Sequence, residues 1–157
     1  MRRPVFFLAF LTLLPMRAFA QESRPTASGV NISPAIGLHF GSPMRFSLAL
    51  GALVDLKGRR DDGIVVLAEP GQHGNEVAIG YFRMLGRFGS GYSVRAAALR
   101  TGGDPWNASA HTTYAGVEGQ WMIALGAGGR IGYLRRVSRS LDTQRDHLAT
   151  VGLVIGI

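Results

Sequence analysis

The last eleven residues, His147–Ile157 (HLATVGLVIGI), decide the fold of this chain. From Ala149 to Ile157 every second residue is apolar, and the residues between them are small or weakly polar. A period of two is that of a β-strand with one face in an apolar medium. No later segment covers the edge of this strand, so we expect an earlier strand to pair with it and close the sheet into a barrel.

Seven further segments complete the expected barrel, each bounded by Gly, Pro, Asp or Asn clusters. They cover residues 30–40, 45–56, 63–69, 75–85, 91–100, 112–125 and 129–137. Residues 63–69 hardly alternate and are included because the hairpin count requires them. Pro34 lies inside the first segment and predicts a bulge or a late strand start there. The sequence thus predicts an all-β fold, a closed antiparallel up-and-down β-barrel of about eight strands.

The polarity of the two strand faces favours a transmembrane barrel over a soluble one. One face is large and continuously apolar, whereas the other is dominated by Gly, Ala and Ser with isolated charges. In a membrane barrel the apolar face meets lipid and the small, polar face fills the lumen. The long connections 101–110 and 138–146 alternate with short ones at 86–90 and 126–128, which is the asymmetry between outer loops and periplasmic turns.

The N-terminus has the three parts of a secretory signal. Arg2 and Arg3 precede a short apolar core, and Ala18-Phe19-Ala20 is a small-x-small cleavage site. We expect residues 1–20 to be a cleaved signal peptide, 21–29 a polar linker and 30–157 the barrel, located in the cell outer membrane. The absence of cysteine excludes disulfides and a lipoprotein anchor. The formal charge of +7 falls to about +4 after cleavage, and its scattered cations suit anionic lipid headgroups better than nucleic acid.

Three segments carry a resemblance to a known group of proteins. They are the run Tyr114–Gly119, the basic strand Arg130–Arg136 and the terminal strand Ala149–Ile157. With them, most of 30–157 resembles the small outer-membrane β-barrel proteins of the OmpA, OmpX and opacity-protein types. The resemblance implies an eight-stranded transmembrane barrel that is inserted by the barrel assembly machinery. The chain departs from the group at its last position, where Ile157 replaces the usual aromatic residue.

A carboxylate in the expected lumen is the main candidate site. Counting from the neighbouring turns places Glu118 opposite Arg136 and close to Arg95. A buried carboxylate is costly unless it is paired, so we expect these three residues to form a structural ion network. A gate or a binding site is the functional alternative.

Aromatic side chains on the apolar faces predict two interface girdles, and one loop offers an exposed aromatic residue. The expected lipid-interface residues are Tyr81, Tyr92 and Trp121 at the periplasmic end, and Phe40 and Phe46 at the outer end. Trp106, in the loop 101–110, is the candidate for contact with a surface partner. The loop 138–146 carries charges suited to polar partners or to the phosphates of lipopolysaccharide.

The biological role is less constrained than the architecture. We expect a monomeric structural or surface-interaction barrel with a filled lumen, no cofactor and no metal, because eight strands enclose only enough space for side chains. One alternative is a soluble periplasmic ligand-binding barrel. Another is a lipid-modifying hydrolase or acyltransferase, for which His39 and Ser42 are the nearest residues of suitable chemistry, although no spacing matches a hydrolase signature.

Overall fold

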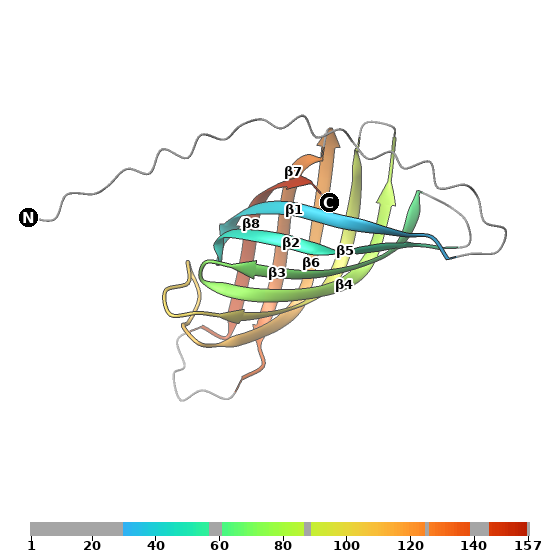
Figure 1. The fold of residues 1–157 in the computed structure, drawn as a ribbon. Helices are drawn as coiled ribbons and strands as arrows, with labels where there is room; N and C mark the ends of the chain where they lie inside the picture. The colour runs from blue at the N-terminus through green and yellow to red at the C-terminus, as the bar shows by residue number, and fades with distance from the viewer. Residues whose placement is uncertain (1–29, 57–60, 87–88, 125, 139–144, 157) are drawn as a thin grey trace, which may run out of the picture.

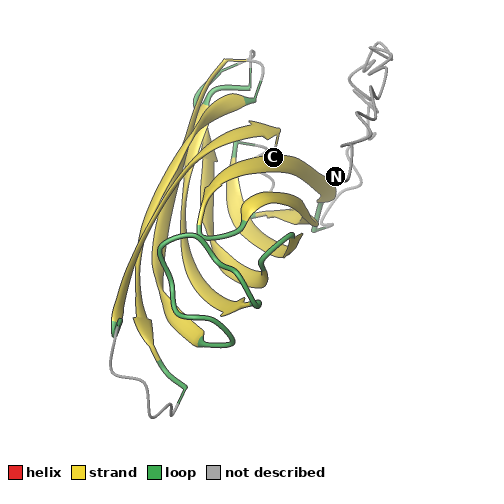
Figure 2. Cartoon of the chain, turned by 90° about the vertical axis from the view of Figure 1, so that its left-hand side faces the viewer, coloured by secondary structure: helices red, strands yellow, loops and turns green. Residues whose placement is uncertain are grey.

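The computed structural model describes residues 30–56, 61–86, 89–124, 126–138 and 145–156, and within them the fold is all-β (Figures 1 and 2). Its eight strands are β1 (Ile32–Ser42), β2 (Arg45–Asp55), β3 (Asp62–Gly71), β4 (Gly74–Met84), β5 (Gly91–Thr101), β6 (Thr113–Ala124), β7 (Ala127–Arg136) and β8 (His147–Gly156). Each strand pairs antiparallel with the next, and β8 pairs with β1, so the sheet is a closed barrel. In the described part, no helix is long and apolar enough to cross a membrane.

The predicted up-and-down barrel of eight strands is therefore confirmed, and the observed strand ends differ from the expected ones by only a few residues. The signal peptide and the linker, residues 1–29, lie outside the described residues, as do 139–144 of the last long loop. These expectations remain predictions.

The seam between β1 and β8 runs from Gly37 opposite Gly156 to Ser42 opposite Val151. Pro34 lies before this seam, in regular register with Ala52, so the predicted bulge or late start is wrong. The backbone N–H of Asp55 donates to the carbonyl oxygen of Asn31, so odd-numbered residues of β1 direct their backbone polar groups toward β2. Pro34 faces the other way, beyond the stretch that pairs with β8, and its missing N–H breaks no bond of the seam.

Strand β3 is the strand that the sequence marks least clearly, for a simple reason. Val65 and Leu67 are buried inside the barrel, whereas Ile64 and Val66 are exposed outside it, so both faces of β3 are apolar. Alternation of hydrophobicity is lost, while alternation of burial is retained along the whole strand.

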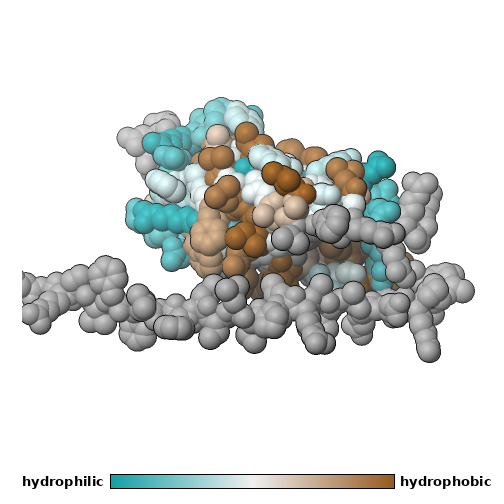
Figure 3. Space-filling model, turned by 90° about the horizontal axis from the view of Figure 1, so that it is seen from above, coloured by the Kyte–Doolittle hydropathy of each residue, from teal (hydrophilic) through white to brown (hydrophobic). Residues whose placement is uncertain are grey.

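The outer surface of the barrel is apolar on every strand. Exposed large side chains such as Ile36, Ile79, Val94, Ile123 and Leu153 occupy its outward positions. On the face seen in Figure 3, hydrophobic side chains gather across the middle and hydrophilic ones lie toward the two ends.

The interior has three layers along the barrel. Near the β1–β2 turn, Met44, Leu99, Tyr114, Leu134 and Leu148 form an apolar cluster together with Ala78 and Ala97. Toward the opposite end, a second cluster contains Ala35, Val65, Leu67 and Phe82. Buried charged side chains occupy the space between the clusters, so apolar groups close the lumen on both sides of them.

Two lumen-facing glycines of β1 differ in how closely the backbone of β8 approaches them. A Cβ atom at Gly41 would lie 2.1 Å from the backbone oxygen of Val151, whereas at Gly37 its nearest neighbour would be the Ile155 oxygen at 3.4 Å. We expect Gly41→Ala to lower the free energy of unfolding by about 1–3 kcal/mol, because backbone must move to accept the methyl group. The matched Gly37→Ala variant should be unchanged, or more stable by about 0.5–1 kcal/mol. Urea unfolding measures both, and equal effects would contradict the seam register.

Candidate functional site

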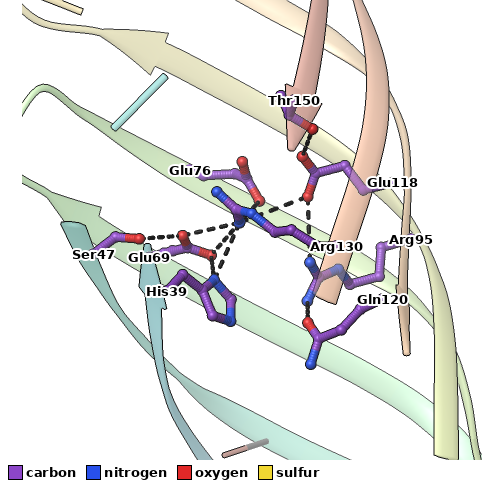
Figure 4. A network of polar contacts seen from close by, with 9 residues as sticks. All are labelled: His39, Ser47, Glu69, Glu76, Arg95, Glu118, Gln120, Arg130 and Thr150. Atoms are coloured by element: carbon purple, nitrogen blue, oxygen red, sulfur yellow. Dashed lines mark hydrogen bonds and ion pairs between the residues drawn. The ribbon is translucent and has the colours of Figure 1, made fainter. Parts of the chain in front are cut away.

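The middle of the lumen holds a polar network of five charged side chains (Figure 4). They come from five neighbouring strands: Glu69 from β3, Glu76 from β4, Arg95 from β5, Glu118 from β6 and Arg130 from β7. Each is at most 2% exposed. Charges buried this deeply are costly unless they are paired and hydrogen-bonded, so the contacts of each member of the network bear on the stability of the barrel.

Arg130 is the centre of the network. Its Nη1 lies 3.0 Å from both carboxylate oxygens of Glu69 and donates to them. Glu69 also accepts from the hydroxyl of Ser47, and its Oε2 lies 2.7 Å from His39 Nδ1. Glu69 thus has three partners from three other strands, which connects β7 to the opposite wall of the barrel.

Glu118 makes a second set of contacts in the network. Its Oε2 lies 3.3 Å from Arg95 Nη2, and its Oε1 accepts a 2.7 Å hydrogen bond from Thr150. Arg95 in turn donates from Nη1 to the amide oxygen of Gln120 at 2.9 Å. The residue opposite Glu118 on β7 is Gly132, where a Cβ atom would lie 2.6 Å from Glu118 Cγ, so only glycine leaves room for this carboxylate.

Glu76 is held less firmly than the other two carboxylates. Its Oε1 lies 3.7 Å from Arg130 Nη1. Neither of its oxygens accepts a hydrogen bond from the residues that the structure describes. Glu76 also lies directly opposite Glu69 in the β3–β4 register, and like charges placed opposite each other are destabilising. The guanidinium of Arg130 between them offsets this repulsion.

The expected pairing of Glu118 with Arg136 is wrong. Glu118 lies opposite Gly132, and Arg136 lies opposite Tyr114 at the end of β7. There are two reasons. The turn is tighter than the glycines suggest, because Ala124 already pairs with Ala127 and Gly126 has a φ of +73°, and the register shifts by one further residue between Met122 and Ala124. The register therefore moves by four residues, and Arg130 takes the place expected for Arg136, whose Nη1 instead lies 3.8 Å from Asp146 Oδ1. Arg95 does lie opposite Glu118.

Several members of the network were missed by the sequence argument, and a signal for them exists. They are His39, Ser47, Glu69, Glu76, Gln120, Arg130 and Thr150. All occupy inward positions, so a list of every polar residue on the inward faces would contain them. What such a list lacks is the register between strands, and the register decides which of these groups touch.

The predicted girdle aromatics all point outward in the structure. Tyr92 and Trp121 are cross-strand neighbours near one end of the barrel, and Tyr81 lies near them on β4. Phe40 and Phe46 pair at the other end with ring centroids 5.0 Å apart. Tyr133 of β7, which is not among the predicted girdle residues, is 59% exposed and also points outward.

The loop that carries Trp106 is bound to the β1–β2 turn. The backbone N–H of Trp106 donates to the carbonyl oxygen of Pro43, the hydroxyl of Ser42 donates to the carbonyl oxygen of Trp106, and Arg45 pairs with Asp104 at 3.0 Å. The indole ring remains exposed. Trp106 is therefore presented on an anchored loop, at the rim of the barrel.

The residues considered for catalysis are not brought together. His39 points into the lumen toward Glu69 (Figure 4), whereas the hydroxyl of Ser42 is engaged by the Trp106 carbonyl oxygen at the rim. Among the described residues, no group of three or more His, Asp or Glu side chains could hold a metal ion.

Fold and site together define a class: an eight-stranded antiparallel barrel whose closed wall is apolar outside and whose interior is filled by side chains around buried ion pairs. A small cavity of about 20 Å³ beside Leu67, Arg95 and Met122 is large enough for one water molecule. Comparison with protein-family models, curated proteins and solved structures finds no match to this chain.

A double-mutant cycle tests the Glu118–Arg95 contact. We expect Glu118→Ala and Arg95→Ala each to lower the free energy of unfolding by about 3–5 kcal/mol, because each leaves the other charge buried without its partner. The double variant should lose clearly less than the sum. In the control cycle of Glu118→Ala with Arg136→Ala, the two effects should add within about 0.5 kcal/mol, because their register positions are far apart. Coupling to Arg136 rather than to Arg95 would contradict the observed register.

The charge balance of the lumen predicts that Glu76 is dispensable. Glu76→Gln leaves two carboxylates with two arginines and removes the repulsion from Glu69, so we expect the free energy of unfolding to change by less than about 1 kcal/mol. Glu118→Gln keeps the same shape but weakens the contacts to Arg95 and Thr150, and should cost about 2–3 kcal/mol. Urea unfolding of the two glutamine variants measures this difference. A larger loss for Glu76→Gln would mean that Arg130 depends on Glu76.

Proposed function

We propose that this chain is a small outer-membrane β-barrel protein with a structural or surface-interaction role and a closed, side-chain-filled lumen. The observation that carries the proposal is the inverted polarity of the barrel. Arg95, Arg130 and Glu118 are buried inside it, whereas residues such as Ile123 and Leu153 are exposed outside it.

A bilayer accounts for this polarity better than water does. Exposed apolar surface in water costs roughly 25 cal/mol per Å², and the apolar surface here extends around all eight strands. Soluble monomers rarely expose continuous apolar patches larger than a few hundred Å². A closed barrel also pairs the backbone groups of its strands with each other, which the hydrocarbon interior of a membrane requires.

The outward aromatic residues support the same assignment. Tyr81, Tyr92 and Trp121 lie toward one end of the apolar surface, and Phe40 and Phe46 toward the other. Aromatic residues at both edges of an apolar band are typical of membrane-spanning barrels, where they occupy the two lipid–water interfaces.

The filled interior argues against an open pore and against a soluble ligand-binding barrel. Apolar clusters lie on both sides of the ion network, and the small cavity beside Arg95 has too little room for an organic ligand. Specific contacts would therefore be made by the rim and the outer wall. Trp106 on its anchored loop is the candidate for a surface partner. The expected partners are outer-membrane lipids, with lipopolysaccharide as a candidate among them, and the barrel assembly machinery.

Fractionation of cells that express the full chain tests the proposal. We expect the mature protein to begin at Gln21, to sediment with outer membranes and to migrate faster on a gel without heating than after boiling. The shift is expected because detergent alone does not open a closed barrel. A soluble periplasmic monomer that shows no such shift would contradict the membrane assignment and favour the ligand-binding barrel. A membrane protein whose envelope phenotype is lost with Ser42→Ala, but not with Trp106→Ala, would favour a lipid-modifying enzyme.

A further inference from the structure

One sector of the outer wall combines an exposed arginine with an apolar surface. On the outward face of β7 and β8, Arg135 lies opposite His147 at the outer end, and Tyr133 lies opposite Ala149 in the next outward pair. The following outward pair is Ile131 and Val151, which are 57% and 60% exposed. This pair of strands thus changes from cationic and polar to apolar within three cross-strand pairs.

The polar end of this sector has hydrogen-bond donors that face outward. The hydroxyl of Tyr133 lies 2.6 Å from His147 Nδ1, and the two rings stack with centroids 5.5 Å apart. With the phenol hydroxyl donating to Nδ1, Nε2 carries the imidazole hydrogen and remains able to donate to a ligand. The guanidinium and the imidazole therefore offer donors from adjacent positions on the two strands.

No acid neutralises Arg135 among the residues that the structure describes. Asp146 is close in sequence, but its carboxylate pairs with Arg136 at 3.8 Å. On the β1–β2 side of the same rim the situation differs, because Arg45 is already paired with Asp104. An exposed guanidinium beside an imidazole, with no acid of its own, is suited to a phosphate oxygen.

An apolar hollow lies further along β8. Where β8 meets β1, a depression of about 290 Å³ is lined by Phe40, Trp106, Val151 and Leu153. Between His147 and Val151, the only other outward position of β8 is Ala149, whose small side chain leaves the path along the wall open. The distance from His147 to Val151 along the strand is about 13 Å, which one lipid molecule can cover.

We propose that this sector binds an anionic, phosphate-bearing lipid, and the proposal rests on the membrane assignment above. Arg135 and His147 bind the phosphate of the headgroup. One acyl chain follows the wall past Ala149 and lies in the hollow between Phe40, Trp106 and Leu153. Charge complementarity at the Arg135 end and apolar surface further along β8 match the two parts of a lipid.

Fluorescence quenching by brominated lipids tests this site on the folded, full-length mature barrel. In a Trp121→Phe background, Trp106 is the remaining tryptophan of the chain and lines the hollow. The barrel is inserted into phosphatidylcholine vesicles that contain a small fraction of either brominated phosphatidic acid or brominated phosphatidylcholine. Contact between a brominated chain and the indole quenches its emission, so the two titrations compare the affinities of the two lipids.

We expect the site to prefer phosphatidic acid by about fivefold, the effect of one basic residue near an anionic headgroup. Arg135→Ala combined with His147→Ala should reduce the preference to parity. Arg100→Ala is the matched control, because it removes an exposed outward arginine of β5 at the same end, away from the hollow, and should keep the preference.

The outcomes separate this proposal from the membrane assignment. Equal quenching by both lipids in the parent protein, or a preference that survives the double substitution, overturns the lipid site while leaving the membrane barrel intact. An absence of quenching by either lipid, in protein that is recovered with the vesicles, means that no acyl chain reaches the hollow beside Trp106, and it overturns the lipid site alone. Protein that is not recovered with the vesicles overturns both.

Discussion

The guanidinium of Arg130 lies inside the closed wall with the carboxylates of Glu69, Glu76 and Glu118 at 3.0, 3.7 and 3.9 Å. These carboxylates belong to β3, β4 and β6, so one side chain of β7 is connected to three other strands through charge. Removing an ion of this kind from water costs several kcal/mol, which is recovered only if its partners are held in place. The network therefore constrains the width of the lumen, and the apolar clusters on both sides of it keep the dielectric around it low.

The inverted polarity of the wall follows from the same arrangement. Five charged side chains occupy the middle of the lumen, and many of the large hydrophobic residues lie in outward positions. The proposed bilayer location would cover this outward face with lipid. The contents of the lumen are thus connected to the proposed location, because each side chain of a strand lies either in the lumen or on the outer wall.

Much of the architecture follows from the sequence because strand faces are encoded locally. The alternation in β1, β2 and β8 is visible in the residue types alone, and so is the inward position of Glu118. Pairing between strands is different, because it depends on turn geometry that glycine-rich sequences leave open. Because the turn around Gly126 is tight and the register shifts beside it, the residue opposite Glu118 is Gly132 and not Arg136, and Arg130 belongs to the network instead. Pro34 was misjudged for a related reason: the extent of the β1–β8 seam could not be derived from either strand alone.

That seam also has a kinetic consequence. It joins Gly37 to Gly156, residues separated by nearly the whole described chain, whereas every other pairing joins neighbours in sequence. The seven pairings between consecutive strands can form one after another along the chain, but the pairing of β1 with β8 requires the last strand. Until then β1 and β8 present unpaired backbone edges, which are templates for association with other chains. Pairing between strands so far apart in sequence is slow. The barrel in which β1 and β8 are not yet paired is therefore the form most exposed to aggregation and proteolysis.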